Sequence, residues 1–363
     1  MALQVLSFVF KLGKILALTP SSLTIKQESV ISKLYNVLIL SLLSGGMFVE
    51  ISEKNFYSEL IFVKKVVCIF GDLIIYILNF YSIIVMGLSK KKSWKHLMEN
   101  LESTEYLVRI QNRKNDRIWY FLGIGLANLY YFASISYMVY VRYDSMGWRY
   151  LNHVQGYLDL YQKLIQWVII KMVWARYKGL KSLLSAYKQK NQNRQFSTDL
   201  KRFEYIMSQL KTTVDVFNEL FGWPLLLMIA STIIQVLNTI DFIIFYHNER
   251  LEPFDSFLVN TFLVTTALVS GTIVLILACD SVVKEAGAVV TLGYDLRCCL
   301  KTAQFLDDLK LKKFTNFLEK NLPKFTAANF FHVGRWTILD LFETLITFLI
   351  IMIQFGNSAR KQQ

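Results

Sequence analysis

The sequence predicts an all-α polytopic membrane protein with seven transmembrane helices, and three observations carry this prediction. Of the 363 residues, 54% are hydrophobic and only 18% are charged, a composition too apolar for a soluble fold. Seven apolar segments are each long enough to cross the hydrocarbon core, which takes about 20 residues of helix. The basic residues between these segments fall mostly in alternate connections, as they do in proteins that cross a bilayer repeatedly.

The seven predicted spans succeed one another along the whole chain. They are Leu34 to Ile51, Val66 to Leu88, Ile118 to Val141, Val154 to Trp174, Leu225 to Tyr246, Phe257 to Cys279, and Trp336 to Phe355. The third and sixth contain no charged residue, whereas the fourth is the weakest because it contains Asp159, Lys163 and Lys171. The charge distribution still requires the fourth span, since without it the richest basic connections would lie on opposite sides of the membrane.

Lysine and arginine set the expected orientation. Thirty of them lie in the first 33 residues and in the connections 89–117, 175–223 and 280–335. With Lys64 and Lys65 placed at the edge of the second span, six lie in the other connections and at the C-terminus. Because basic connections stay in the cytoplasm, we expect a cytoplasmic N-terminus and an extracellular C-terminus. The net charge of +13 then reflects topology, and we expect no binding to nucleic acid.

Two stripes of apolar residues extend the helical pattern into the basic connections. They recur at helical spacing at Leu200, Phe203, Met207, Leu210, Val214 and Phe217, and again at Ala286, Val289, Gly293, Leu296 and Leu300. We therefore expect helices that continue beyond the membrane. An apolar stripe in so basic a segment needs a partner, which is either the same chain folded on itself or the equivalent helices of other subunits.

The last predicted span carries a polar stripe. Asp340, Glu343, Thr347, Ile351 and Gln354 advance by 3, 4, 4 and 3 positions and so share one face of a helix. Carboxylates cannot face lipid, so this face either lines a water-filled path or packs against another helix. In the first case the carboxylates would attract cations, and Ile351 or the neighbouring Ile350 could close the path by dewetting.

A second polar group lies in the outer halves of the second to sixth spans. A few hydrogen-bonding groups among aromatic rings suit a small-molecule pocket. The alternative is an interfacial belt of aromatic residues, with Asp159 and Lys163 neutralising each other at a spacing of four. The candidate pocket residues are Tyr131, Ser134, Tyr137, Asp159, Gln162, Trp167, Gln235, Asn238 and Asn260.

Two motifs near the C-terminus resemble those of the insect gustatory receptor family. The first resembles that family's Thr-Ala-x-Gly-Phe-Phe stretch and comprises Phe325, Thr326, Ala327, Phe330 and Phe331. The second resembles its Thr-Tyr-five-apolar-Gln-Phe signature and comprises Thr347, Phe348, Gln354 and Phe355. Asn329 replaces the usual glycine and Phe348 the usual tyrosine. The rest of the chain shares only length and span layout with the family.

The resemblance implies a ligand-gated, non-selective cation channel that acts as a taste receptor for a small organic tastant. It also implies a homotetramer, or a heteromer with related subunits, held by a cytoplasmic helical anchor in the plasma membrane of gustatory sensory neurons. Sugar-sensing members typically carry glutamate where Leu349 stands, which favours a non-sugar ligand. Lipid is the remaining expected partner.

This reading divides the chain into four regions. Residues 1–33 form a cytoplasmic segment, and 34–279 hold spans one to six with their cytoplasmic extensions and the outer pocket. Residues 280–335 form the anchor helices, and 336–363 form the pore-lining helix with a short extracellular tail. Lys11 and Lys14 interrupt the apolar start and no small-residue cleavage site follows, so we expect a retained amphipathic segment rather than a signal peptide.

Other functional classes are disfavoured. A seven-span G-protein-coupled receptor has an outward N-terminus, against the charge distribution, and a secondary transporter would show internal repeats or paired glycine-proline breaks. The four histidines fall in four different connections, and no glycine-rich phosphate loop is present, so we expect no enzyme, metal site or cofactor.

Overall fold

The computed structural model describes residues 2–20, 30–53, 62–108, 114–142, 150–190, 196–249, 254–299 and 305–360. The chain is almost wholly helical in these ranges. In chain order the elements are α1 (Ala2–Ile15), α2 (Val30–Glu53), α3 (Phe62–Tyr81), the π-helical segment η2 (Ser82–Ser89), α4 (Lys91–Val108), α5 (Lys114–Arg142), α6 (Tyr150–Lys190), α7 (Phe196–Glu249), α8 (Phe254–Cys299), α9 (Phe305–Lys320), the strands β1 (Thr326–Ala327) and β2 (Phe331–His332), and α10 (Arg335–Arg360).

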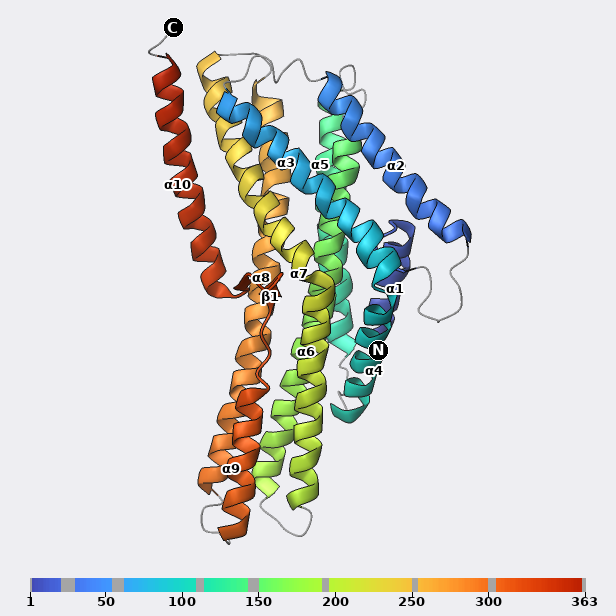
Figure 1. The fold of residues 1–363 in the computed structure, drawn as a ribbon, viewed down its shortest axis with the longest axis vertical. Coiled ribbons are helices and arrows are strands. Elements are labelled where there is room, and N and C mark those ends of the chain that lie inside the picture. Colours follow the sequence, from blue (N-terminus) through green and yellow to red (C-terminus); the bar gives the residue numbers. More distant parts are fainter. Residues whose placement is uncertain are drawn as a thin grey trace.

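The molecule is an elongated bundle with a broad upper half and a narrow lower half (Figure 1). The upper half contains α2, α3, α5 and α10 beside the upper parts of α6, α7 and α8, and the lower half contains the other ends of these long helices with α9. α7 has 54 residues. At a rise of about 1.5 Å per residue it is roughly 80 Å long, far more than the ~30 Å of a hydrocarbon core. The predicted extension of helices beyond the membrane is thus confirmed.

The all-α membrane fold is confirmed by the apolar content of the helices. Within the described residues, five helical stretches are long and apolar enough to span a membrane: Val30–Phe48, Ile69–Ser89, Ile118–Tyr137, Thr198–Ile240 and Thr261–Cys298. The other two predicted spans lie in α6 and α10 and carry the charged residues noted above. Successive helices of the upper half alternate in direction (Figure 1), as seven crossings would require.

Three of the four prolines lie next to helix ends. Pro20 and Pro323 lie just beyond α1 and α9, and Pro253 immediately precedes α8. Proline lacks a backbone N–H, and at these positions a helix needs no such donor. Pro224 is the exception, because it lies inside α7, next to the predicted start of the fifth span. It removes one backbone hydrogen bond of α7 close to the β-strands, since Gly222, two residues earlier, lies against the backbone of Ala328.

A cluster of aromatic side chains forms the core at this level. Trp94 of α4 packs edge-on against Phe221 of α7, with ring centroids 5.4 Å apart, and Phe217 packs against Phe221 at 4.8 Å. The indole of Trp94 donates a hydrogen bond to the Met86 carbonyl oxygen of η2 at 3.1 Å. Phe325, just before β1, extends the cluster to the C-terminal motif, with its ring 5.4 Å from Phe217.

The two apolar stripes are buried within the single chain. The apolar side chains from Leu200 to Phe217 are buried on α7, which packs against α4 and α6. Gly293 of α8 faces α9 so closely that an added Cβ would lie 2.8 Å from Leu318 Cδ1. Of the two partners considered, helices of the same chain cover the described positions of both stripes. The assembly of subunits through these segments stays a prediction. Leu300 lies outside the described residues.

The segment between α9 and α10 is not helical, unlike the anchor helices expected across 280–335. β1 and β2 form a two-stranded antiparallel hairpin in which Thr326 pairs with His332 and Ala327 with Phe331. Its turn places Ala328 and Asn329 at φ angles of 49° and 61°, a left-handed conformation that asparagine tolerates and glycine favours. This geometry explains why the related motif has glycine where Asn329 stands.

Candidate functional site

α10 packs on the rest of the chain along one face only. Its neighbours are α7 and α8. The packed face is made of buried or half-buried side chains at Thr337, Ile338, Leu341, Thr344, Leu345 and Leu349. Figure 1 shows the helix at the edge of the upper half, with its foot at the β-hairpin. Most of the circumference of α10 is therefore left uncovered by its own chain.

The predicted polar stripe lies on the uncovered part of α10. Asp340, Glu343, Thr347, Ile351 and Gln354 are all exposed in the single chain. The Thr347 hydroxyl donates to the Glu343 carbonyl oxygen at 2.9 Å, which keeps its proton within the helix. Within the described residues, the stripe is therefore not buried against another helix of the same chain.

A third face of α10 is apolar and also exposed. It consists of Leu339, Phe342, Ile346 and Ile350, each at least half exposed. At about 100° per residue, the packed, polar and apolar faces are centred roughly 100° to 140° apart around the helix. One helix can thus contact its own chain, a polar environment and an apolar environment at the same time.

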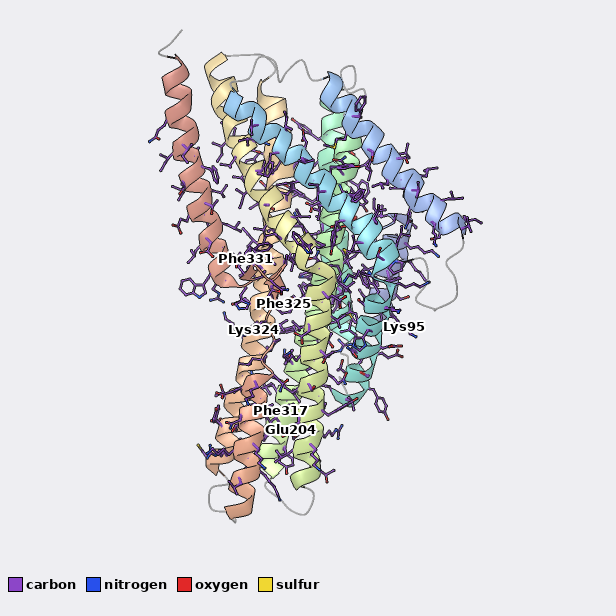
Figure 2. The ribbon with its side chains drawn as sticks, viewed as in Figure 1. Lys95, Glu204, Phe317, Lys324, Phe325 and Phe331 are labelled. Carbon is purple, nitrogen blue, oxygen red and sulfur yellow. The ribbon has the colours of Figure 1, made fainter. Side chains whose placement is uncertain are left out.

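The C-terminal motif residues anchor the foot of α10. Phe325 and Ala327 are buried, and Figure 2 shows Phe325 and Phe331 close to the hairpin below α10. Asn218 of α7 donates to the Lys324 carbonyl oxygen at 2.7 Å and accepts from the Thr326 backbone N–H at 3.1 Å. The hairpin is thus fixed to α7, and it sets where α10 begins.

The other motif residues are more accessible. Phe330 is exposed and packs edge-on against Trp223 of α7, with centroids 6.0 Å apart. Phe348 is 47% exposed on α10, whereas the Phe355 side chain lies outside the described residues. The rings of Phe330 and Phe348 are therefore accessible to lipid or to a neighbouring subunit.

A cavity of about 690 Å³ lies in the upper half between α5, α6 and α8. Small residues contribute to the lining, and some lining side chains, among them Leu126, Leu129 and Val274, are exposed on the surface of the bundle. The volume is in the range of pockets that hold drug-sized molecules. Its lining residues are Gly123, Leu126, Ala127, Leu129, Tyr130 and Ala133 of α5, Leu160, Lys163, Leu164 and Trp167 of α6, and Thr266, Ala267, Ser270, Gly271 and Val274 of α8.

Of the predicted pocket residues, Trp167 lines this cavity. Asp159 lies in the wall behind it and forms an ion pair with Lys163, with Nζ 2.8 Å from Oδ2. Both side chains are almost fully buried. The mutual neutralisation considered for this pair is thus present, and it explains how α6 carries two charges within a predicted span.

The other predicted pocket residues lie elsewhere. Gln162 and Gln166 point between α3 and α7: Gln162 donates to Asn79 Oδ1 at 3.5 Å and Gln166 to Met228 Sδ at 3.6 Å. Their carbonyl oxygens have no hydrogen-bond partner in the described part of the chain, so this interface is suited to a buried water or ligand group. Tyr131 and Ser134 are buried on α5, Tyr137 is half-buried there, Gln235 and Asn238 are half-buried on α7, and the Asn260 side chain lies outside the described residues.

Sequence reasoning missed the small residues that create the cavity. Gly123 and Ala127 are four positions apart on α5, and Ala267 and Gly271 are four apart on α8. Pairs of small residues at this spacing let membrane helices or ligands approach the backbone. The spacing of four between small residues could have indicated the cavity from the sequence. The prediction was instead based on polar and aromatic side chains, which lie at neighbouring positions.

Comparisons with known proteins agree with this architecture. A family model described as 7tm Chemosensory receptor matches residues 6–358. Among solved structures, the chain is similar to the insect olfactory receptor OR5 from Machilis hrabei, with a TM-score of 0.66 and 11% identity over 96% of this chain and 97% of that one. The same receptor in complex with eugenol matches with a TM-score of 0.66 and 10% identity over 98% and 99% of the two chains. No curated protein matches.

At such low identity the solved structures establish the shared fold, while the family model covers almost the whole chain. The prediction of an insect chemoreceptor from the two C-terminal motifs is confirmed. The chain belongs to the 7tm chemosensory receptor family.

Proposed function

We propose that the chain is a ligand-gated, non-selective cation channel in which α10 lines the pore. The observation that best supports this proposal is the polar face of α10, which is exposed in the single chain and includes Asp340 and Glu343. Carboxylates on a membrane-spanning helix need water or a polar partner. Arranged around a symmetry axis, equivalent faces would supply that partner and form a wall that attracts cations.

The same geometry supports an assembly of subunits, proposed as a homotetramer or a heteromer with related chains. The exposed apolar face of α10, from Leu339 to Ile350, adjoins the polar one. It suits contact with a neighbouring subunit or with lipid. Because the cytoplasmic stripes are covered within one chain, α10 and the outer surfaces of the lower helices are the available contacts.

We assign the channel to taste reception of a small organic molecule, at the plasma membrane of gustatory sensory neurons. The two C-terminal motifs, which resemble those of gustatory receptors, support this role. A receptor of similar fold has been solved with eugenol, which supports a small-molecule ligand. Binding in the cavity would open the pore only to the extent that the ligand binds the open state more tightly than the closed one.

The orientation gives a first test. From the 30 to 6 distribution of basic residues, an epitope after Gln363 is expected to bind antibody on intact cells, and one before Met1 only after permeabilisation. Antibody staining of the two tagged proteins measures this. The reverse pattern would contradict the assigned sides of the membrane and favour a G-protein-coupled receptor.

The channel itself is tested by expressing the chain alone in cells without related receptors. Application of small organic compounds is expected to evoke cation currents with unitary steps in excised patches, where soluble second messengers are lost. An untransfected patch and a patch bearing an unrelated membrane protein are the controls. Responses that need intact cytoplasm and G proteins, or transport currents without unitary steps, would refute a ligand-gated channel.

A further inference from the structure

The wall of the cavity contains a buried ion pair. Lys163 lines the cavity, and its ammonium donates to Asp159 Oδ2 at 2.8 Å and to the Leu268 carbonyl oxygen of α8 at 3.4 Å. Each of the two charged side chains is only 4% exposed. A charged pair in this position is costly unless further hydrogen bonds satisfy it. The pair is thus the strongest polar feature that the cavity presents.

This pair selects for a neutral ligand with a hydrogen-bond acceptor. An ammonium group has three N–H donors, and the protein contacts above use one short and one long bond. Asp159 itself does not line the cavity, so a bound molecule meets the lysine end of the pair. A carboxylate ligand would lose the hydration of a full charge in a mainly apolar cavity whose one ammonium is already paired with Asp159, and a cation would be repelled by Lys163. A neutral carbonyl, ester or ether oxygen meets neither penalty.

The remaining lining disfavours molecules with many hydroxyl groups. Three hydroxyl side chains border the cavity, and each already donates to a backbone carbonyl oxygen: Tyr130 to Leu263, Thr266 to Phe262, and Ser270 to Ala267. Most other lining residues are apolar or lack a long side chain. A sugar would lose hydration at several hydroxyls without gaining equivalent bonds. An apolar molecule loses little and gains burial.

The position of Lys163 depends on the absence of a side chain opposite it. A Cβ added to Gly271 of α8 would lie 3.3 Å from Lys163 Cδ. The lysine stem therefore lies along α8 at the cavity wall. The exposed lining residues Leu126 and Leu129 are apolar, which suits the entry of molecules that partition into the bilayer.

From these contacts we propose that the cavity binds a neutral, mainly apolar molecule with one accepting oxygen, such as a ketone or an ester, and that the Lys163 ammonium donates to that oxygen. The proposal rests on the proposed chemoreceptor function and names the ligand class of that site. Asp159 is the positioning residue, because it holds the ammonium at the wall.

Equilibrium binding to the purified full-length protein tests the proposal without using current. The probes are acetophenone, methyl benzoate and 2-octanone, each compared with a hydrocarbon of similar shape: ethylbenzene, propylbenzene and octane. Benzoate and sucrose complete the panel. At least one oxygen-bearing probe is expected to bind at least about tenfold more tightly than its hydrocarbon match, as one well-aligned hydrogen bond to a charged donor allows.

A double variant, Lys163→Met with Asp159→Leu, removes both charges and leaves no lone buried ion. We expect it to bind the hydrocarbon as well as the unmodified protein does, while the preference for the oxygen-bearing probe falls to within about twofold. Lys171→Met is the matched control. Lys171 lies two turns further along α6, over the ring of Trp174 at 5.2 Å and outside the cavity lining, so this variant should keep the preference.

Three outcomes would overturn the proposal: an unchanged preference in the double variant, tighter binding of benzoate or sucrose, or no binding by any oxygen-bearing probe. Binding of the expected class without any evoked current would instead refute the channel and leave the ligand class intact. Unitary currents evoked by sugars or carboxylates would instead support the channel and refute the proposed ligand class.

Discussion

Replacing Arg176 with methionine is expected to destabilise the protein by about 3–5 kcal/mol, the range for removing one partner of a buried charged network. Arg176 lies on α6 just beyond the fourth predicted span and is 1% exposed. Methionine is shorter than arginine but has a similar volume, so it leaves no large cavity. The predicted loss therefore comes from hydrogen bonds rather than from packing volume.

The guanidinium of Arg176 holds α4 against α6. It donates to the Leu101 carbonyl oxygen at 2.6 Å and 3.1 Å and to the Thr104 hydroxyl at 2.9 Å, and it lies 3.3 Å from the Glu105 carboxylate. A further bond reaches the Met172 carbonyl oxygen within α6. Burial lowers the pKa of the Arg176 guanidinium to about 10, so it is still charged at neutral pH.

Removal of this charge takes the guanidinium hydrogen bonds from the Leu101 and Met172 carbonyl oxygens and from the Thr104 hydroxyl, and it leaves the Glu105 carboxylate without its cation. Arg176→Lys should lie between wild type and methionine, because a single ammonium cannot reproduce the planar fork of donors. Denaturant unfolding in mixed micelles measures the change in free energy.

Arg202→Met is the matched control for this experiment. Arg202 also donates to a carbonyl oxygen of α4, that of Leu107 at 3.0 Å, but its side chain is exposed. Its replacement should change stability by less than about 0.5 kcal/mol, as for most surface substitutions. Equal effects of the two variants would mean that α4 is not held by the buried guanidinium.

The spans could be predicted because burial in lipid imposes a simple rule on sequence. Long apolar runs of sufficient length become helices there, since every backbone group must bond within the segment. Even the fourth span, with Asp159 and Lys163, lies in one continuous helix. The spacing of four that suggested neutralisation places the two side chains side by side on α6.

Partners were harder to predict than helices. The periodic stripe from Leu200 to Phe217 shows that one face is buried, but the same pattern arises whether α4 and α6 or another subunit covers it. The approach of α9 to Gly293 depends on packing between segments distant in sequence. The hairpin at Thr326 has strands of two residues each, too short for a period-two pattern to be recognisable.

The cavity illustrates a different limit. A sequence displays side chains, whereas a cavity is made where side chains are missing, as at Gly123 and Gly271. Polar residues such as Gln162 were assigned to a pocket because their chemistry suits ligands. The rotation of each helix, set by packing along its whole length, decides which neighbour they face.

The largest functional effect is expected at the polar face of α10. In a protein whose four native cysteines are replaced, single cysteines at Glu343, Thr347 and Gln354 should react with a water-soluble cationic thiol reagent. The reaction should block most of the evoked current, because these positions share one exposed face separated by 4 and 7 residues. The measurement is the fraction of current lost after the reagent is washed out.

The other faces of α10 supply two controls. Cysteine at Leu341 or Leu345 lies on the face packed against α7 and α8 and should not react. Cysteine at Phe342 or Ile346 lies on the exposed apolar face, which the proposed assembly places against a neighbouring subunit or lipid, and it should react slowly or not at all. Phe348 and Met352, rotated from the polar face by about 100° or more, belong with these controls.

Charge at the same face provides an independent measure. Glu343→Lys should lower the unitary cation conductance, because it replaces attraction by repulsion in a narrow water-filled path. Glu343→Gln should have a smaller effect in the same direction, since it removes attraction without adding repulsion. If the conductance stays unchanged in both, or if Phe342 and Ile346 react as readily as Thr347, then the polar face contacts protein and the ions pass elsewhere.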